Sequence, residues 1–377
     1  MFDRRTVGPP AEAGTVMEVL PDAAGPQDAV TATTRRRAGS IRRTTNIDTL
    51  RPDGLRADAV VDARARDLRT NLDGTTDVVG TATLQARISP TRELLSIGTF
   101  PDIPALQSLL GASVGPGFRS RVNAIVTDGC EDGSLLYLLL DDLPGATLVS
   151  GYALVRATFD EAPSIDEGPQ TDRPRPAPPA APPAGSATGP FPDFGAQDDI
   201  CAGWAHDATM LVHVRETGSL PVTLGPPAPI LEDDADPISW HVMADLAPHA
   251  VRRRRRLDLL VPPEGAREHA IDLHFRDSHV DGQGRETIMH EYTMSGAIDL
   301  EVGRIGSVSA RAHVLPWVEC PAALASAQRV DGMDLAALRT RVRKEFVGRS
   351  TCTHLNDSLR SLADVTALHL ALGMPPA

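Results

Sequence analysis

Residues 269–302 read HAIDLHFRDSHVDGQGRETIMHEYTMSGAIDLEV, a stretch typical of two β-strands joined by a tight turn. The strand candidates are 269–279 and 286–302, and between them Asp281 to Gly284 is a hairpin turn signal. The sequence therefore predicts an antiparallel hairpin here.

More elements of both kinds flank this hairpin. Further strand candidates are 254–261 and 307–318, and the segments 321–329, 334–346 and 353–372 read as helices. The last of these has Leu355, Leu359, Leu362 and Thr366 along one face. Strands gathered before helices predict an α+β fold with helices covering an antiparallel sheet.

The first half of the chain repeats the order of motifs found in the second half. The motif DARARD at 62–67 corresponds to DLHFRD at 272–277. The segments around Pro104 and Arg119 correspond to those around Pro321 and Arg339. Coincidence in a chain rich in Ala, Arg and Leu is the alternative. We predict two pseudo-repeated units that pair intramolecularly, each an antiparallel sheet covered by C-terminal helices.

Composition suggests boundaries between these units. The segment 162–192 lacks apolar periodicity and is rich in proline. The predicted organisation is a disordered tail (1–39), a first diverged unit (40–156), a Pro-rich linker (157–196), an extended arm (197–249) and a second unit (250–373). The arm is expected to lie over the second unit as a structural strap or a lid.

Charge and cysteine usage exclude some classes of partner. A net charge of -13 and a pI near 5.3 argue against a nucleic acid as main partner. The arginine run from Arg252 to Arg256 is expected to form the solvent-exposed beginning of a strand, rather than a site that binds an anion. The sequence contains no run of about 18 consecutive apolar residues, so no membrane span is predicted. The 4 cysteines lack the dense spacing of a secreted scaffold, which favours the cytoplasm.

Histidine is confined to the second half of the chain. All 11 histidines lie between His206 and His369, and all 3 tryptophans lie in the same half. Because histidine is the side chain most readily used as a proton shuttle or ligand near neutral pH, this bias indicates where a site would be.

The hairpin carries the densest set of candidate catalytic side chains. With a three-residue loop, His274 would lie opposite Tyr292 and Arg276 opposite His290, all on one sheet face, with Asp277 on the other. These groups would supply a proton acceptor, an anion clamp and a hydroxyl donor. A solvated sheet face with cross-strand hydrogen bonds is the alternative.

A second candidate set lies at the start of the final helix. Thr353 is the expected N-cap, and His354 and Asp357 would share a helix face. The helix dipole could stabilise a Cys352 thiolate, which makes Cys352 a candidate nucleophile or ligand. Cys320, Cys352, His354 and His290 hold the right atoms for zinc, but no metal-site spacing supports it, and no metal or cofactor is expected.

The second unit resembles a bacterial domain-of-unknown-function family, the one numbered 2889. The resemblance covers roughly 250–370 and rests on 253–258, 290–292, 320–321 and 352–355. It implies a coherent domain and no particular activity. The first unit departs from it, with Arg64 where the second has His274 and Asp132 where the second has His354.

Two hypotheses of function follow. The first is an enzyme for a small, anionic organic substrate that uses histidine acid/base chemistry, whether as hydrolase, lyase or isomerase, with metal assistance as a variant. The second is a non-catalytic binding or assembly module. The candidate catalytic residues are His274, Arg276, His290, Tyr292, His354 and Asp357.

Overall fold

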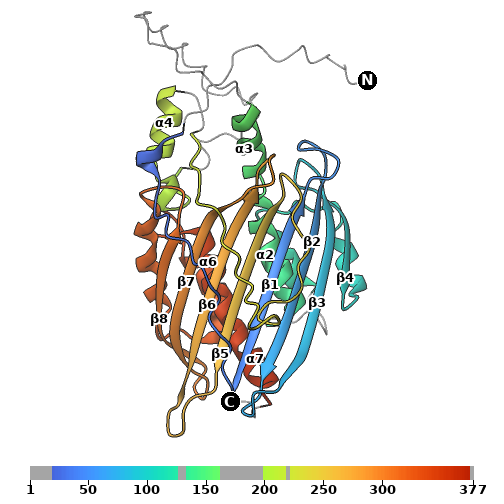
Figure 1. Cartoon of the computed structure of the whole chain (residues 1–377), viewed down its shortest axis with the longest axis vertical. Coiled ribbons are helices and arrows are strands. Elements are labelled where there is room, and N and C mark those ends of the chain that lie inside the picture. The colour runs from blue at the N-terminus through green and yellow to red at the C-terminus, as the bar shows by residue number, and fades with distance from the viewer. Residues whose placement is uncertain (1–18, 126–132, 162–197, 218–220, 374–377) are drawn as a thin grey trace, which may run out of the picture.

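The computed structural model describes residues 19–125, 133–161, 198–217 and 221–373, and its centre is one antiparallel sheet (Figure 1). The sheet has 8 strands in the order β4-β3-β2-β1-β5-β6-β7-β8. The strands are β1 (Ser40–Leu50), β2 (Ala59–Thr70), β3 (Thr76–Ile88), β4 (Leu94–Phe100), β5 (Val251–Leu260), β6 (Glu268–Val280), β7 (Glu286–Asp299) and β8 (Arg304–Val314). The predicted α+β class, with helices on an antiparallel sheet, is confirmed.

The strands of both halves of the chain share this single sheet. β1 pairs with β5 in antiparallel register, with Thr45 opposite Arg255, so one backbone ladder joins the halves. Each half also has a register shift in its second hairpin, after Asp67 in β2 and after Asp277 in β6. The two units are therefore not separate sheets in contact but the two sides of one sheet.

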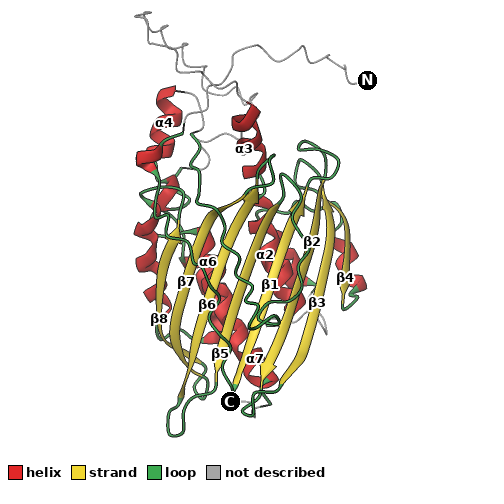
Figure 2. Ribbon diagram, viewed as in Figure 1, coloured by secondary structure: helices red, strands yellow, loops and turns green. Residues whose placement is uncertain are grey.

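Most of the helices cover one face of the sheet (Figure 2). The helices are α1 (Phe118–Ala124), α2 (Leu135–Val149), α3 (Tyr152–Glu161), α4 (Thr209–Thr217), α5 (Leu335–Glu345), α6 (Thr353–Ser361) and α7 (Val365–Ala371), with 3-10 turns at Pro21–Ala23, Pro104–Leu109, Ala202–Trp204, Cys320–Val330 and Leu362–Asp364. Of these, α3 and α4 lie beyond one end of the strands. The expected helix over 353–372 is thus broken at 362–364. Separate apolar clusters lie under the helices of the two halves.

One helical stretch is long and apolar enough to be considered as a membrane-spanning helix. Leu135–Ala157 could cross a membrane by length and composition alone, but 67% of its most apolar window is buried inside the fold. Leu136, Leu140 and Leu143 pack in the core under the first half of the sheet. The stretch therefore serves as a core helix of this domain.

Extended segments run over the opposite face of the sheet, in front of the strands in Figure 1. We call residues 24–38 the first strap and residues 221–250 the second strap. They bond to each other where Thr33 Oγ1 donates to the Leu231 carbonyl, and to the sheet where Val30 N donates to Glu291. Residues 24–38 were expected within a disordered tail but lie on the sheet, and residues 157–161, expected in the linker, form the end of α3. Residues 1–18 and the rest of the linker, 162–196, lie outside the described residues.

The arginine run is not the exposed strand start that its composition suggested. Arg252 to Arg256 lie in β5 at the centre of the sheet, and each is at most 8% exposed. Successive side chains point to opposite faces, and carboxylates meet them on both: Asp48 holds Arg252 on the strap face and Asp142 holds Arg255 on the helix face. Pairing with acidic partners allows a strand this basic to be buried.

Candidate functional site

The β6–β7 hairpin has the expected loop, but a bulge changes its register. Asp281 N donates to the Arg285 carbonyl, which closes a three-residue loop, and Ser278 pairs with Ile288 as expected. The register then shifts at Met289, so that Asp277 pairs with His290. The expected grouping of four side chains on one face is wrong, because an unpaired residue moves every later side chain to the other face.

On the strap face, His274 and Arg276 bind a glutamate that the sequence reading did not assign. His274 Nε2 lies 2.7 Å and Arg276 Nε 2.6 Å from Glu291 Oε1, and all three residues are buried. Burial lowers the pKa of His274 to about 4.

The remaining donors of Arg276 reach the straps. Nη1 donates to the carbonyl of Pro229 and Nη2 to that of Val30, both at 2.7 Å. Arg276 was expected to bind an anion. Its guanidinium instead bonds to Glu291 and to both straps, and so holds the straps on the sheet.

The helix face brings together a different set of three side chains. Asp277 from β6, His290 from β7 and His354 from the first turn of α6 each offer a donor atom within 4.8 Å of the others. Asp277 Oδ2 lies 3.8 Å from His290 Nδ1 and 3.7 Å from His354 Nε2. The imidazole rings stack with centroids 3.6 Å apart. Of these, Asp277 was missed because the predicted register placed it on the other face.

The electrostatic surroundings keep both imidazoles of this set neutral. Burial lowers the pKa of His354 to about 3, helped by the positive charge of Arg253. Burial and the neighbouring His354 lower the pKa of His290 well below its usual value. The side chains are still 15% and 13% exposed, respectively, so solvent reaches both rings.

Arg253 fixes the carboxylate of this set. Its Nε and Nη2 donate to the two oxygens of Asp277 at 2.9 and 3.0 Å, and its Nη1 donates to Asp357 at 2.7 Å. Asp357, predicted as a catalytic residue beside His354, also contacts Arg360 and Arg119. Arginines lower the pKa of Asp357 despite its burial. Its position places it in the charge network that supports the site.

The cysteine at the start of α6 is buried, which disfavours the thiolate that a nucleophile requires. Cys352 itself is the N-cap of α6 and makes no side-chain cap bond, so the expected Thr353 cap is wrong. Burial raises the pKa of Cys352, which outweighs the helix terminus. Tyr292, an expected clamp, instead donates its hydroxyl to Cys352 Sγ at 3.2 Å. The thiol also lies 3.6 Å from His354 Nδ1.

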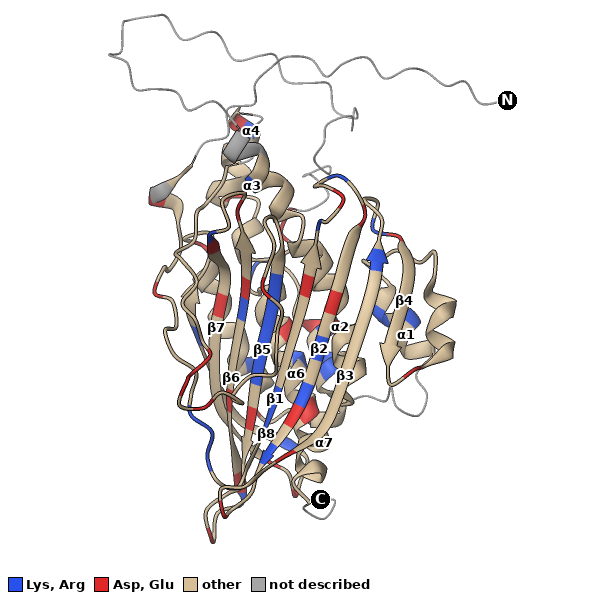
Figure 3. Ribbon diagram, turned by 45° about the vertical axis from the view of Figure 1, so that its right-hand side comes forward, with Lys and Arg blue, Asp and Glu red and all other residues tan. Residues whose placement is uncertain are grey.

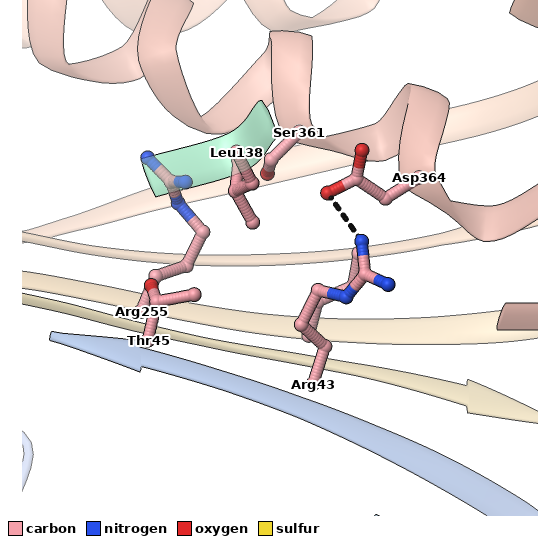
Figure 4. Close-up of a pocket in the computed structure, with 7 residues that line it drawn as sticks. Arg43, Thr45, Leu138, Arg255, Ser361 and Asp364 are labelled. Carbon is pink, nitrogen blue, oxygen red and sulfur yellow. Dashed lines mark ion pairs between the residues drawn. The ribbon is translucent and has the colours of Figure 1, made fainter. Parts of the chain in front are cut away.

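Buried ion pairs extend from this set across the middle of the molecule, and charged residues recur along the strands (Figure 3). In Figure 4 Arg43 reaches from β1 to Asp364 beside α7, at 2.9 Å. Arg255 binds Asp142 of α2 at 2.6 Å. The gap around them holds no space for a water molecule. The two halves of the chain are thus joined by direct charge pairs as well as by the sheet.

An open pocket lies between the first half of the sheet and its covering helices. It has a volume of about 360 Å³ and is lined by Arg43, Asp67, Gly80, Thr81, Ala82, Pro101, Gly133, Ser134, Leu135, Leu136 and Ala367. Gly80 pairs with Asp67 as His290 pairs with Asp277. Asp132, the residue that the motif order matches to His354, lies outside the described residues.

Comparison with known proteins assigns a family to the C-terminal part of the chain. Residues 251–368 match the family described as "Protein of unknown function (DUF2889)", as the sequence resemblance indicated. No curated protein and no solved structure matches the chain. The matched segment contains the whole set of Asp277, His290 and His354.

Proposed function

We propose that this protein is an enzyme for a small anionic organic substrate and that its reacting centre is Asp277, His290 and His354. The observation that supports it best is the stacked pair of neutral, partly exposed imidazoles beside a carboxylate fixed by Arg253. This site replaces the first-choice set of the sequence reading, because His274, Arg276 and Tyr292 are buried and bonded elsewhere.

An anionic substrate fits the acid/base properties of the imidazoles. With a pKa of about 3, His354 is a weak proton acceptor at neutral pH. A bound anion favours the protonated form of a nearby imidazole and so raises its pKa. Substrate binding would thereby adjust His354 and His290 for proton transfer.

Arg119 is the proposed anchor for that anion. Its side chain is 23% exposed, and Asp357, one helical turn from His354, lies 3.5 Å from its Nη2. Nε donates to the Asp141 carbonyl and lies 3.2 Å from Oδ1 of the same residue. A partly exposed guanidinium can bind a carboxylate or phosphate.

The test is turnover on a panel of phosphate esters, carboxylate esters and hydroxy acids. We expect at least about a 100-fold lower kcat/KM in His290→Ala and His354→Ala, which is the usual scale for a lost acid/base group. His206→Ala, at an exposed histidine, is the matched control and should keep full activity. Undiminished activity in both site variants, or no turnover on the whole panel, would count against the proposal.

A binding module is the second candidate, favoured by the pocket over Gly80. That pocket contains no histidine but has a wall of small and polar residues and room for a small molecule. Ligands that bind with equal affinity to wild type and to His290→Ala would support this alternative.

We also infer an internal duplication and a cytoplasmic location. Matching bulges after Asp67 and Asp277, and the Thr45–Arg255 pair at the centre of the sheet, support a pseudo-twofold arrangement like that of an isologous dimer. Unpaired Cys201, Cys320 and Cys352 support a reducing compartment.

A further inference from the structure

Three potential ligand atoms face one another in the site without a hydrogen bond between them. His290 Nδ1 and His354 Nε2 lie 3.8 and 3.7 Å from Asp277 Oδ2, beyond hydrogen-bond length. Among the described residues, His290 Nδ1 is buried and has no hydrogen-bond partner. A buried polar nitrogen without a partner costs free energy, and a cation bound between it and the carboxylate would remove that cost in the tautomer where Nδ1 carries a lone pair.

The other ring nitrogen of His354 has two polar neighbours. Its Nδ1 lies 3.6 Å from Cys352 Sγ and 3.5 Å from Thr353 Oγ1, and each of these groups can donate or accept according to the tautomer. In the tautomer with the proton on Nδ1, Nε2 presents a lone pair to Asp277. A ligating histidine usually donates its other nitrogen in this manner.

We propose that Asp277, His290 and His354 bind one divalent transition-metal ion, of the zinc or iron type. Two imidazole nitrogens and one carboxylate oxygen form the donor set of catalytic sites for these metals. Parts of both histidine side chains are exposed to solvent, which would let water or substrate approach a bound ion. The inference rests on the proposed function for the place of the reacting centre and changes the role of the two rings: with an ion bound, the imidazoles would act as neutral ligands and not as proton acceptors. Ion binding is tested by itself.

Binding requires a modest movement of the rings. Donors on one tetrahedral zinc ion lie about 3.3 Å apart, so each nitrogen must approach the carboxylate by about 0.5 Å. The two nitrogens, which lie within 4.8 Å of each other, must reach the same separation. The rings are tilted by only 19° to each other, and nearly parallel rings cannot both aim their lone pairs at one point. The ion therefore unstacks the pair by rotation about the Cβ–Cγ bond, a torsion with a broad energy minimum.

Arg253 acts as a positioning residue for the ion. Its two bonds to Asp277 hold the carboxylate toward the histidines. No metal was expected from the sequence because the donors considered, Cys320, Cys352, His354 and His290, have no metal-site spacing. Asp277 was not among them. Cys320 and Tyr292 instead belong to the apolar cluster next to the site.

The experiment is calorimetric titration of the full chain with zinc chloride, together with the absorption spectrum of the cobalt-loaded protein. We expect about one equivalent per chain in wild type and in His206→Ala, and at least tenfold weaker binding in His290→Ala and His354→Ala. His290→Asn and Asp277→Asn provide second variants, with circular dichroism as the check on folding. Cobalt should show no thiolate charge-transfer band.

The outcomes separate this inference from the proposed function. Zinc affinity unchanged in the histidine variants, a thiolate band lost in Cys352→Ser, or no binding by folded wild type would each overturn the metal site. Zinc binding without turnover on the substrate panel would leave the metal site standing and remove the enzyme. Turnover that persists at full rate after chelation would remove the metal site and leave the enzyme standing.

Discussion

Replacing Arg255 by methionine should remove a large part of the stability of the fold. Arg255 and Asp142 are 2% and 3% exposed and are joined by two bonds of 2.6 and 3.1 Å. Methionine keeps the apolar stem but leaves the Asp142 carboxylate buried, and burial already raises the pKa of that group. Breaking a buried pair from one side costs about 3–5 kcal/mol, a large share of the roughly 5–15 kcal/mol that holds a domain together.

Urea unfolding followed by circular dichroism measures this loss. Arg341→Met removes the exposed Arg341–Glu345 pair and should leave the free energy of unfolding almost unchanged, because solvent screens such a pair. The double variant Arg255→Met, Asp142→Leu should regain most of the loss, because it leaves no lone charge. A loss below about 1 kcal/mol in the single variant, or a double variant as unstable as the single one, would refute the account of the buried charges.

Three further changes test other parts of the structure. Ser134→Ala removes the N-cap bond to Tyr137 N and should cost about 1 kcal/mol in urea unfolding, whereas no loss would deny the cap a role. Gly225→Ala would place a Cβ 1.6 Å from the Ile288 carbonyl oxygen, so we expect a loss of about 1–3 kcal/mol and faster amide exchange in the second strap. His241 has a pKa lowered to about 3 by burial, so its contribution is complete above about pH 6.5 and is lost as the pH falls toward 3. His241→Asn should remove up to about 1.4 kcal/mol per pH unit from the slope of stability in that window, and an unchanged slope would contradict this reading.

The α+β class and most elements of the second half could be predicted from sequence because their patterns are local. The helix start at Thr353 and the loop after Asp281 needed only spacing and turn chemistry. The sharing of one sheet could not be predicted, since pairing of β1 with β5 joins residues about two hundred positions apart along the chain.

The candidate site was predicted in part. His290 and His354 were identified as chemically suited residues, but their partner Asp277 depends on a bulge at Met289 that has no clear sequence signal. The same bulge moved Glu291 to the side of His274 and Arg276. The prediction that Arg252 to Arg256 form an exposed strand start was wrong. Carboxylates from distant segments of the chain, such as Asp48 and Asp142, neutralise these arginines and allow their burial.

The most direct test of the central claim is a crystal structure of the protein grown with zinc, with anomalous diffraction measured at the zinc edge. We predict one strong anomalous peak about 2.0–2.2 Å from His290 Nδ1, His354 Nε2 and a carboxylate oxygen of Asp277, with the two rings no longer stacked. A structure in which the rings remain stacked at 3.6 Å with no peak beside them, or a peak on Cys320 and Cys352 instead, would contradict the claim that these three residues form the functional centre.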